Sequence, residues 1–112
     1  MSAPRLPTHL VFSGLIRATQ AAGGFATVLA RGDADSGILL ILTMDRGENA
    51  RLWERMPTLD GARPFVVSKS QEPEKEQEFT DYWRRRVAQD PDCWVIELDV
   101  PNPERLIVEA AG

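Results

Sequence analysis

The feature that most constrains the fold is an apolar run, GILLILTM, at residues 37–44. Its apolar side chains occupy consecutive positions, whereas a strand with one solvated face alternates apolar and polar residues. A strand of consecutive apolar residues is typical of a sheet that is covered on both faces. The run therefore predicts a central strand in a protein built from layers of helix and sheet.

The segment before this strand predicts an amphipathic helix. Apolar residues recur near the helical period over residues 10–22, Thr8 is a candidate N-cap, and the glycine pair at 23–24 ends the helix. Phe12 and Ile16 lie off the main apolar stripe, so the helix is apolar over a wide arc. We expect two sides of this helix to be covered, the second by the chain's own sheet edge or by another copy of the protein.

The rest of the chain predicts more strands and a second helix. This helix covers residues 73–89, with Pro73 in its first turn and an apolar stripe that includes Phe79 and Trp83. Further strands are predicted at residues 25–31, 50–54, 65–68, 93–100 and 106–108. The order helix, four strands, helix, two strands defines an α+β fold, a mainly antiparallel sheet of five to six strands packed with two main helices. The helix at 73–89 is the one connection long enough for a crossover, which leaves room for one parallel pair.

Length and composition fit a single globular domain over residues 1–112. The chain is 43% hydrophobic and 27% charged, and both values are typical of a soluble domain. Its net charge of −4 argues against general affinity for nucleic acid, and no apolar run approaches the roughly 20 residues of a membrane-spanning helix. The single cysteine, Cys93, cannot form an internal disulfide. We therefore expect a cytoplasmic protein with no nucleic-acid partner and no membrane partner.

The segment RGDADSG, residues 31–37, places two acids beside a glycine between two predicted strands. An EF-hand loop counted from Asp33 fails at three positions, including the glutamate required at the twelfth. Asp, Ser and Gly are also the residues that favour turns. The segment therefore predicts a hairpin connection, with Asp33 and Asp35 as candidate ligand-binding residues.

Three more charged residues are candidates. Glu97 and Asp99 lie two apart on a predicted strand, so both point to the face opposite its apolar residues. Two carboxylates roughly 7 Å apart at their α-carbons can share a proton or hold a divalent ion, and the alternative is pairing with arginine at the sheet rim. Arg17 lies on the most apolar helix, where a charge must reach the rim or find a carboxylate. Its candidate partners are Asp33, Asp35 and Glu97.

No catalytic or metal motif is complete. Cys93 has no base near it in the sequence, because the only histidine is His9. One cysteine and one histidine fall short of a zinc ligand set, and the glycine pair at 23–24 lacks the lysine and spacing of a phosphate loop. Three arginines at 84–86 suit the negative end of a helix dipole, so we expect a solvated helix end there. We expect no cofactor and no metal, and assign no catalytic residue.

The segments LIRATQAAGGFATVLARGDADSG and DPDCWVIELD resemble a small bacterial family, domain of unknown function 1491. The likeness runs from about Leu10 to Asp99 and is strongest in RGDADSG and in the DPDxWVIELD pattern. The resemblance implies a single cytoplasmic domain of helices and strands, and it carries no activity, ligand or site residue to this chain.

Two functions stay open. The first is a small protein-interaction or regulatory module with an unknown protein partner, or with a second copy bound at the wide apolar face of the first helix. The second is a small-ligand-binding protein or enzyme that uses Arg17 with Asp33, Asp35, Glu97 or Asp99, and it predicts that these side chains converge in one cleft. We favour the first, because no complete motif supports the second.

Overall fold

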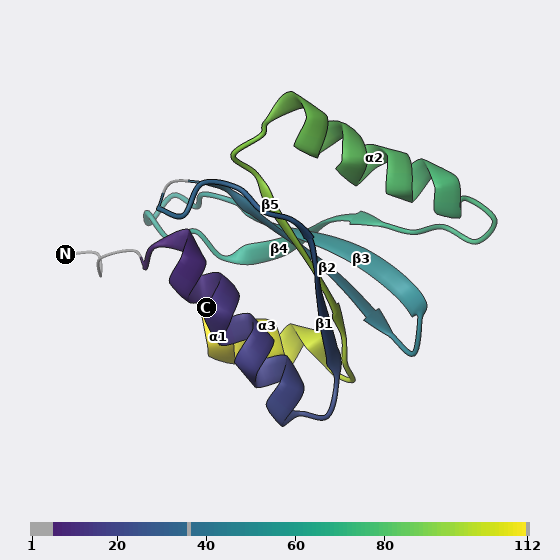
Figure 1. Ribbon diagram of the computed structural model, residues 1–112, viewed down its shortest axis with the longest axis horizontal. Helices are drawn as coiled ribbons and strands as arrows, with labels where there is room; N and C mark the ends of the chain where they lie inside the picture. Colours follow the sequence, from purple (N-terminus) through teal and green to yellow (C-terminus); the bar gives the residue numbers. More distant parts are fainter. Residues whose placement is uncertain (1–5, 36, 112) are drawn as a thin grey trace.

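The computed structural model describes residues 6–35 and 37–111, which form three helices and one five-stranded sheet (Figure 1). In chain order the elements are α1 (Thr8–Ala21), β1 (Phe25–Ala30), β2 (Leu39–Asp45), β3 (Glu48–Arg55), β4 (Phe65–Ser70), α2 (Glu76–Gln89), β5 (Trp94–Asp99) and α3 (Pro103–Ala111). The strand order is β1-β5-β2-β3-β4, with β2 and β5 parallel and all other neighbours antiparallel. The sheet is therefore mixed and mostly antiparallel, with one parallel pair.

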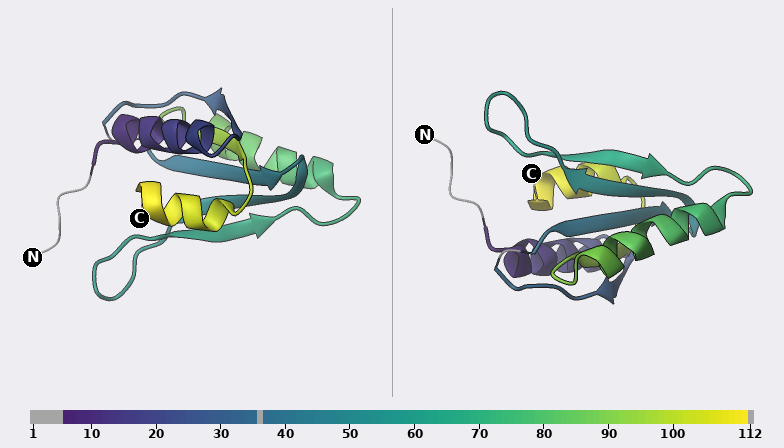
Figure 2. Two further views of the ribbon diagram at one scale, coloured as in Figure 1. Left: turned by 90° about the horizontal axis from the view of Figure 1, so that it is seen from below. Right: turned by 90° about the horizontal axis from the view of Figure 1, so that it is seen from above.

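The middle strand of the sheet is β2, and it is covered on both faces. Residues Leu39 to Thr43 are all buried. Helices α1 and α3 lie on one face of the sheet and α2 lies on the other, as the views from below and above show (Figure 2). The two-sided burial predicted from the run GILLILTM is confirmed.

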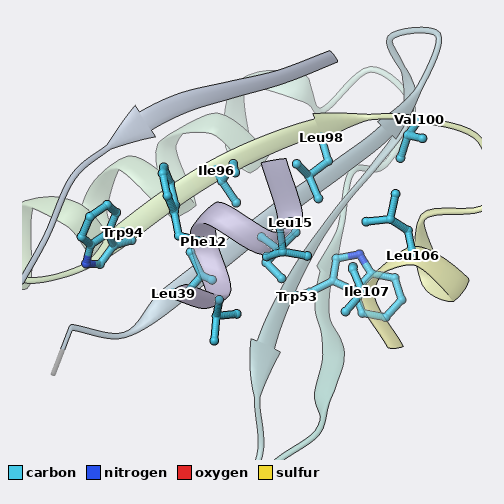
Figure 3. Close-up of a cluster of buried hydrophobic side chains, with 12 residues drawn as sticks. Phe12, Leu15, Leu39, Trp53, Trp94, Ile96, Leu98, Val100, Leu106 and Ile107 are labelled. Atoms are coloured by element: carbon cyan, nitrogen blue, oxygen red, sulfur yellow. The ribbon is translucent and has the colours of Figure 1, made fainter. Parts of the chain in front are cut away.

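The larger core lies between the sheet and the layer of α1 and α3 (Figure 3). Phe12 and Trp94 pack there with their ring centroids 4.7 Å apart, and the indole N–H of Trp53 donates a 2.8 Å hydrogen bond to the Thr43 hydroxyl. Its buried members are Val11, Phe12, Leu15, Leu39, Ile41, Trp53, Trp94, Ile96, Leu98, Val100, Leu106 and Ile107.

A smaller core lies beneath α2. Phe79 is the one fully buried residue of this helix, and Tyr82, Trp83 and Val87 pack beside it, so the predicted apolar stripe is confirmed. The other buried members of this core are Leu40, Leu42, Ala50, Leu52, Cys93 and Val95.

The last element is a helix, and the strand predicted over residues 106–108 is wrong. Pro103 is the first residue of α3, a position whose backbone N–H makes no hydrogen bond within a helix, so proline is tolerated there. Glu104 follows in the first turn, where an acid is favoured by the helix dipole. Leu106 and Ile107 are buried, whereas Val108 is exposed. The β-branched pair at 107–108 favours a strand locally. The helix-starting residues Pro103 and Glu104, and the helical spacing of the buried residues, favour a helix and outweigh that preference.

This third helix provides the second cover that the wide apolar arc of α1 requires. A Cβ atom added at Gly14 of α1 would lie 3.9 Å from the carbonyl oxygen of Ala110 in α3, so the two helices are in contact. The cover is thus part of the same chain.

Two predicted helix starts are wrong. Thr8 is not an N-cap, because its hydroxyl donates a 2.6 Å hydrogen bond to the carbonyl oxygen of Gly37. Pro73 precedes α2, which begins only at Glu76, after the left-handed residue Glu74. In both cases a contact or turn outside the helix determines where it begins.

Candidate functional site

The described residues of RGDADSG, 31–35 and 37, belong to a crossing loop and not to the predicted hairpin, and Ser36 lies outside the described residues. β1 and β2 do not pair, because β5 lies between them, so the loop that joins them passes across the start of β5. The backbone N–H of Asp33 donates a 3.1 Å hydrogen bond to the carbonyl oxygen of Asp92. The indole N–H of Trp94 donates a 2.7 Å hydrogen bond to the carbonyl oxygen of Asp33. The two segments that carry the family resemblance therefore bind each other.

Two glycines allow this close approach. A Cβ atom at Gly32 would lie 1.9 Å from the carbonyl oxygen of Asp92, and one at Gly37 would lie 2.1 Å from the same oxygen. The loop also contacts α1, because the backbone N–H of His9 donates a 3.1 Å hydrogen bond to the carbonyl oxygen of Ala34. The two glycines of RGDADSG thus allow the loop to pack against the chain at Asp92.

The two acids of this loop, Asp33 and Asp35, are exposed. The carboxylate of Asp33 accepts a 3.2 Å hydrogen bond from the backbone N–H of Asp35, the bond that shapes an Asx turn. In residues 6–35 and 37–111, no three His, Cys, Asp or Glu side chains are grouped so that they could hold a metal ion. The geometry at these acids is that of a turn.

Glu97 and Asp99 differ in what surrounds them. The carboxylate of Asp99 accepts hydrogen bonds from the backbone N–H groups of Arg46, at 2.7 Å, and Gly47, at 3.1 Å. Both of these residues have a left-handed φ, and their two hydrogen bonds fasten the turn between β2 and β3 to Asp99. The carboxylate of Glu97 makes no hydrogen bond or salt bridge with any residue that the structure describes. Burial, assisted by the charge of Asp99, raises the pKa of Glu97.

These acids belong to a part of the sheet that we call the open corner: Phe25, Thr27, Met44, Glu97 and Asp99. In the sheet register Asp99 lies between Phe25 and Met44, and Glu97 lies beside Thr27. Residues directly opposite on neighbouring strands point to the same face. The start of β1 and the end of β5 lie at the bottom of Figure 1, away from α2. Phe25 is 75% exposed, so an uncovered aromatic ring lies on the same face as Glu97, whose carboxylate pairs with no cation among the described residues.

Arg17 does not join this group. It is exposed on α1, a helix on the other face of the sheet, and it has no hydrogen bond or ion pair with the described residues. Asp33 lies at the start of β5 and Asp99 at its end, roughly 17 Å apart along the strand. The five candidate residues therefore occupy three places, and their role in binding a ligand stays a prediction.

Cys93 and His9 do not form a nucleophile–base pair. Cys93 is fully buried beneath α2, and burial raises the pKa of its thiol to about 11. The His9 ring is exposed, and its Nδ1 atom lies 3.1 Å from the carbonyl oxygen of Ala34. At neutral pH the thiol is protonated and inaccessible, which is the opposite of what a nucleophile needs.

A polar cleft that the sequence did not single out lies between the turn after β2 and the start of α3. Its volume is about 550 Å³. It is lined by Met44, Asp45, Asn49, Arg51, Asn102, Pro103, Glu104 and Arg105. Arg51 pairs with Glu104 at 2.8 Å, and Arg105 pairs with Glu109 at 2.9 Å. Because both cations already have an acidic partner, the cleft offers neither of them free to a ligand.

Sequence reasoning missed three residues of the open corner, Thr27, Met44 and the exposed aromatic residue Phe25. Its strand, FATVLA, contains apolar residues on both faces, so the pattern alone does not show which of them a helix leaves uncovered. The signal that was present is its position: an aromatic residue directly after a glycine pair, at the first residue of a strand.

The fold and these surfaces define a small α+β protein with a mixed five-stranded sheet between one helix and a pair of helices. The chain belongs to the DUF1491 family, whose description is "protein of unknown function" and whose model matches residues 6–108. A crystal structure of a DUF1491 family protein from Caulobacter crescentus CB15 is similar, with 35% identity and a TM-score of 0.74. The similarity covers 84% of this chain and 87% of that chain.

Two structures determined in solution are also similar. An NMR structure of a DUF1491 family protein from Caulobacter crescentus CB15 shares 33% identity over 93% of this chain and 94% of that chain, with a TM-score of 0.72. The solution structure of protein Atu0922 from A. tumefaciens shares 25% identity over 92% of each chain, with a TM-score of 0.74. No curated protein matches the chain. Among the described residues, no helix has the length and apolar character needed to cross a membrane.

Proposed function

We propose that this protein is a protein-interaction module and that its partner binds at the open corner. The observation that carries the proposal is the exposure of Phe25, an aromatic residue that is 75% open to solvent on a sheet face. Met44, half-buried, lies on the same face two strands away. A contiguous apolar patch that is bordered by polar groups marks a site of interaction with other proteins.

The edge strand β1 supports the same proposal. It is the first strand in the sheet order, and FATVLA contains neither a charged residue nor a proline. Edge strands usually carry such residues, because they prevent pairing with another chain. A bulge between Val28 and Ala30 interrupts the far half of the strand, but Phe25 and Thr27 lie in the regular half. The free edge and the open corner are therefore continuous.

A second copy of the protein is one candidate partner, although the reason for a homodimer through α1 is gone, because α3 covers the apolar arc of that helix. A homodimer would accordingly use the open corner. A cytoplasmic location is part of the proposal, and the buried free thiol of Cys93 supports it.

Ligand binding or catalysis by Arg17 with Asp33, Asp35, Glu97 or Asp99 is less favoured. It needs these side chains in one cleft, and they lie in three places. The polar cleft beside α3 contains none of them. Protein binding at the open corner uses Glu97 and Asp99 without the others.

The test is site-specific photo-crosslinking in native cell extract. A benzophenone amino acid replaces Phe25 in one variant and Leu59 in a second, because Leu59 is fully exposed in the β3–β4 loop and outside the open corner. Irradiation should yield a crosslinked protein at position 25 that mass spectrometry identifies, and none at position 59. An identified partner should also bind wild type in a purified mixture and lose at least tenfold affinity for Phe25→Ser. Crosslinks that are absent, or equal at both positions, would contradict the proposal.

A further inference from the structure

We infer that the segment which binds the open corner is basic as well as apolar, with an arginine or lysine side chain that pairs with Glu97 while its apolar neighbours cover Phe25. The inference rests on the proposed function and specifies the chemistry of the partner.

The charge of Glu97 is the first argument. A second partly buried glutamate on this protein, Glu54, has an exposed side-chain fraction of 16% and forms a 2.8 Å salt bridge with Arg86 of α2. Glu97 is half-buried as well, yet no cation among the described residues pairs with it. Asp99 adds a second negative charge beside it, and the two backbone N–H groups of the turn bind the carboxylate of Asp99 and not that of Glu97. The open corner therefore contains one carboxylate whose natural partner is a cation from another molecule.

The surroundings favour the same sign of charge. The turn beside Asp99 carries two acids, Asp45 and Glu48, and one cation, Arg46. The whole chain has a net charge of −4. A basic segment is attracted to such a surface and an acidic one is repelled.

The apolar part of the corner sets the second requirement. Phe25 lies diagonally across from Glu97 in the register, about 7–8 Å away between α-carbons. One arginine side chain spans this separation, because its stem covers apolar surface while its guanidinium group reaches a carboxylate. The protein itself stacks a guanidinium group on a phenyl ring elsewhere: the guanidinium of Arg55 lies 4.4 Å from the ring centre of Phe65. A cation over the Phe25 ring would gain the same stacking contact.

The experiment uses the full-length protein and a random 12-residue peptide library displayed on phage. Enriched peptides are synthesised and titrated against wild type and four variants. Two variants alter the corner, Glu97→Gln and Phe25→Ser. Two are matched controls outside it: Glu109→Gln removes an exposed carboxylate on α3, and Leu59→Ser removes an exposed apolar side chain in the β3–β4 loop. Circular dichroism confirms that every variant is folded.

We expect enriched peptides that combine arginine or lysine with apolar residues. Their affinity should fall at least tenfold for each corner variant and change less than twofold for each control, and 300 mM salt should weaken binding relative to 50 mM. Peptides without basic residues, or equal binding to wild type and Glu97→Gln, would overturn the inference. If such peptides still lose affinity for Phe25→Ser, the proposed function survives and only the charge preference is wrong. If no peptide is enriched, the inference fails, and the crosslinking experiment decides separately whether the proposed function fails as well.

Discussion

A methyl group on Gly32 would lie 1.9 Å from the carbonyl oxygen of Asp92. No heavy atoms approach so closely without movement of the backbone, and this oxygen also accepts the N–H of Asp33. Gly32→Ala should therefore lower the free energy of unfolding by about 3 kcal/mol, the upper end of the usual cost of overpacking. Urea denaturation followed by circular dichroism measures the change.

The matched control is Gly14→Ala. Gly14 is inside α1, and a Cβ atom there would meet its nearest neighbour, the carbonyl oxygen of Ala110, at an ordinary 3.9 Å. Alanine in a helix interior is favoured over glycine, so this variant should gain about 1 kcal/mol. Equal effects of the two substitutions would show that the loop is not packed as the structure describes.

The contact between Gly32 and Asp92 also explains why the sequence predicts a hairpin where the chain forms a crossing loop. RGDADSG has the composition of a hairpin turn, and β1 and β2 are consecutive strands. The strand that separates them, β5, comes from more than fifty residues later in the chain, and no local pattern reveals such an insertion. By contrast, the two-sided burial of β2 follows from the consecutive apolar residues of the strand itself, so it could be predicted.

Two buried threonines should respond in opposite ways to substitution by valine. The Thr43 hydroxyl accepts the indole N–H of Trp53 at 2.8 Å inside the larger core. Thr43→Val leaves that N–H buried without a partner, so the free energy of unfolding should fall by about 1–3 kcal/mol. The Thr19 hydroxyl is buried with no hydrogen-bond partner among the described residues, so Thr19→Val should raise it by up to about 1 kcal/mol. Thermal and urea unfolding of both variants measure the signs.

The thiol of Cys93 should report how firmly α2 is held. Burial raises its pKa from 9.0 to about 11, so the thiolate fraction at pH 8 is about 100-fold lower than for the unshifted thiol, and the side chain is inaccessible besides. Native protein should thus react with a thiol reagent only when α2 moves away. Arg86 bridges α2 to Glu54 at 2.8 Å, so Arg86→Met should accelerate labelling about tenfold. The control is Arg85→Met, because Arg85 is exposed on the same helix; a similar acceleration there would remove the role of the salt bridge.

The candidate site was predictable only in part. Alternation along β5 is enough to place Glu97 and Asp99 on one face. Which of the two carboxylates accepts hydrogen bonds depends on the turn at Arg46 and Gly47, whose backbone N–H groups reach Asp99 from a distant part of the chain. Whether Phe25 is covered depends on where α2 lies across the sheet, and helix amphipathicity does not contain that information.

Glu97→Gln should make the protein more stable at neutral pH. Burial and the charge of Asp99 raise the pKa of Glu97 above its unfolded value of 4.5. Below pH 4.5 the carboxyl is protonated in both states and contributes no difference. As the pH rises through the higher folded pKa, the unfolded state releases its proton more readily, so the ionised Glu97 lowers the free energy of unfolding. The glutamine variant lacks this loss, so its advantage over wild type should grow between pH 4 and pH 7 in urea denaturation. A basic peptide bound at the open corner should cancel the stability advantage of Glu97→Gln, because a bound cation stabilises the ionised carboxylate and lowers the pKa of Glu97. A carboxyl NMR titration measures that pKa. An advantage that is constant across this pH range would mean that Glu97 is already compensated in the free protein.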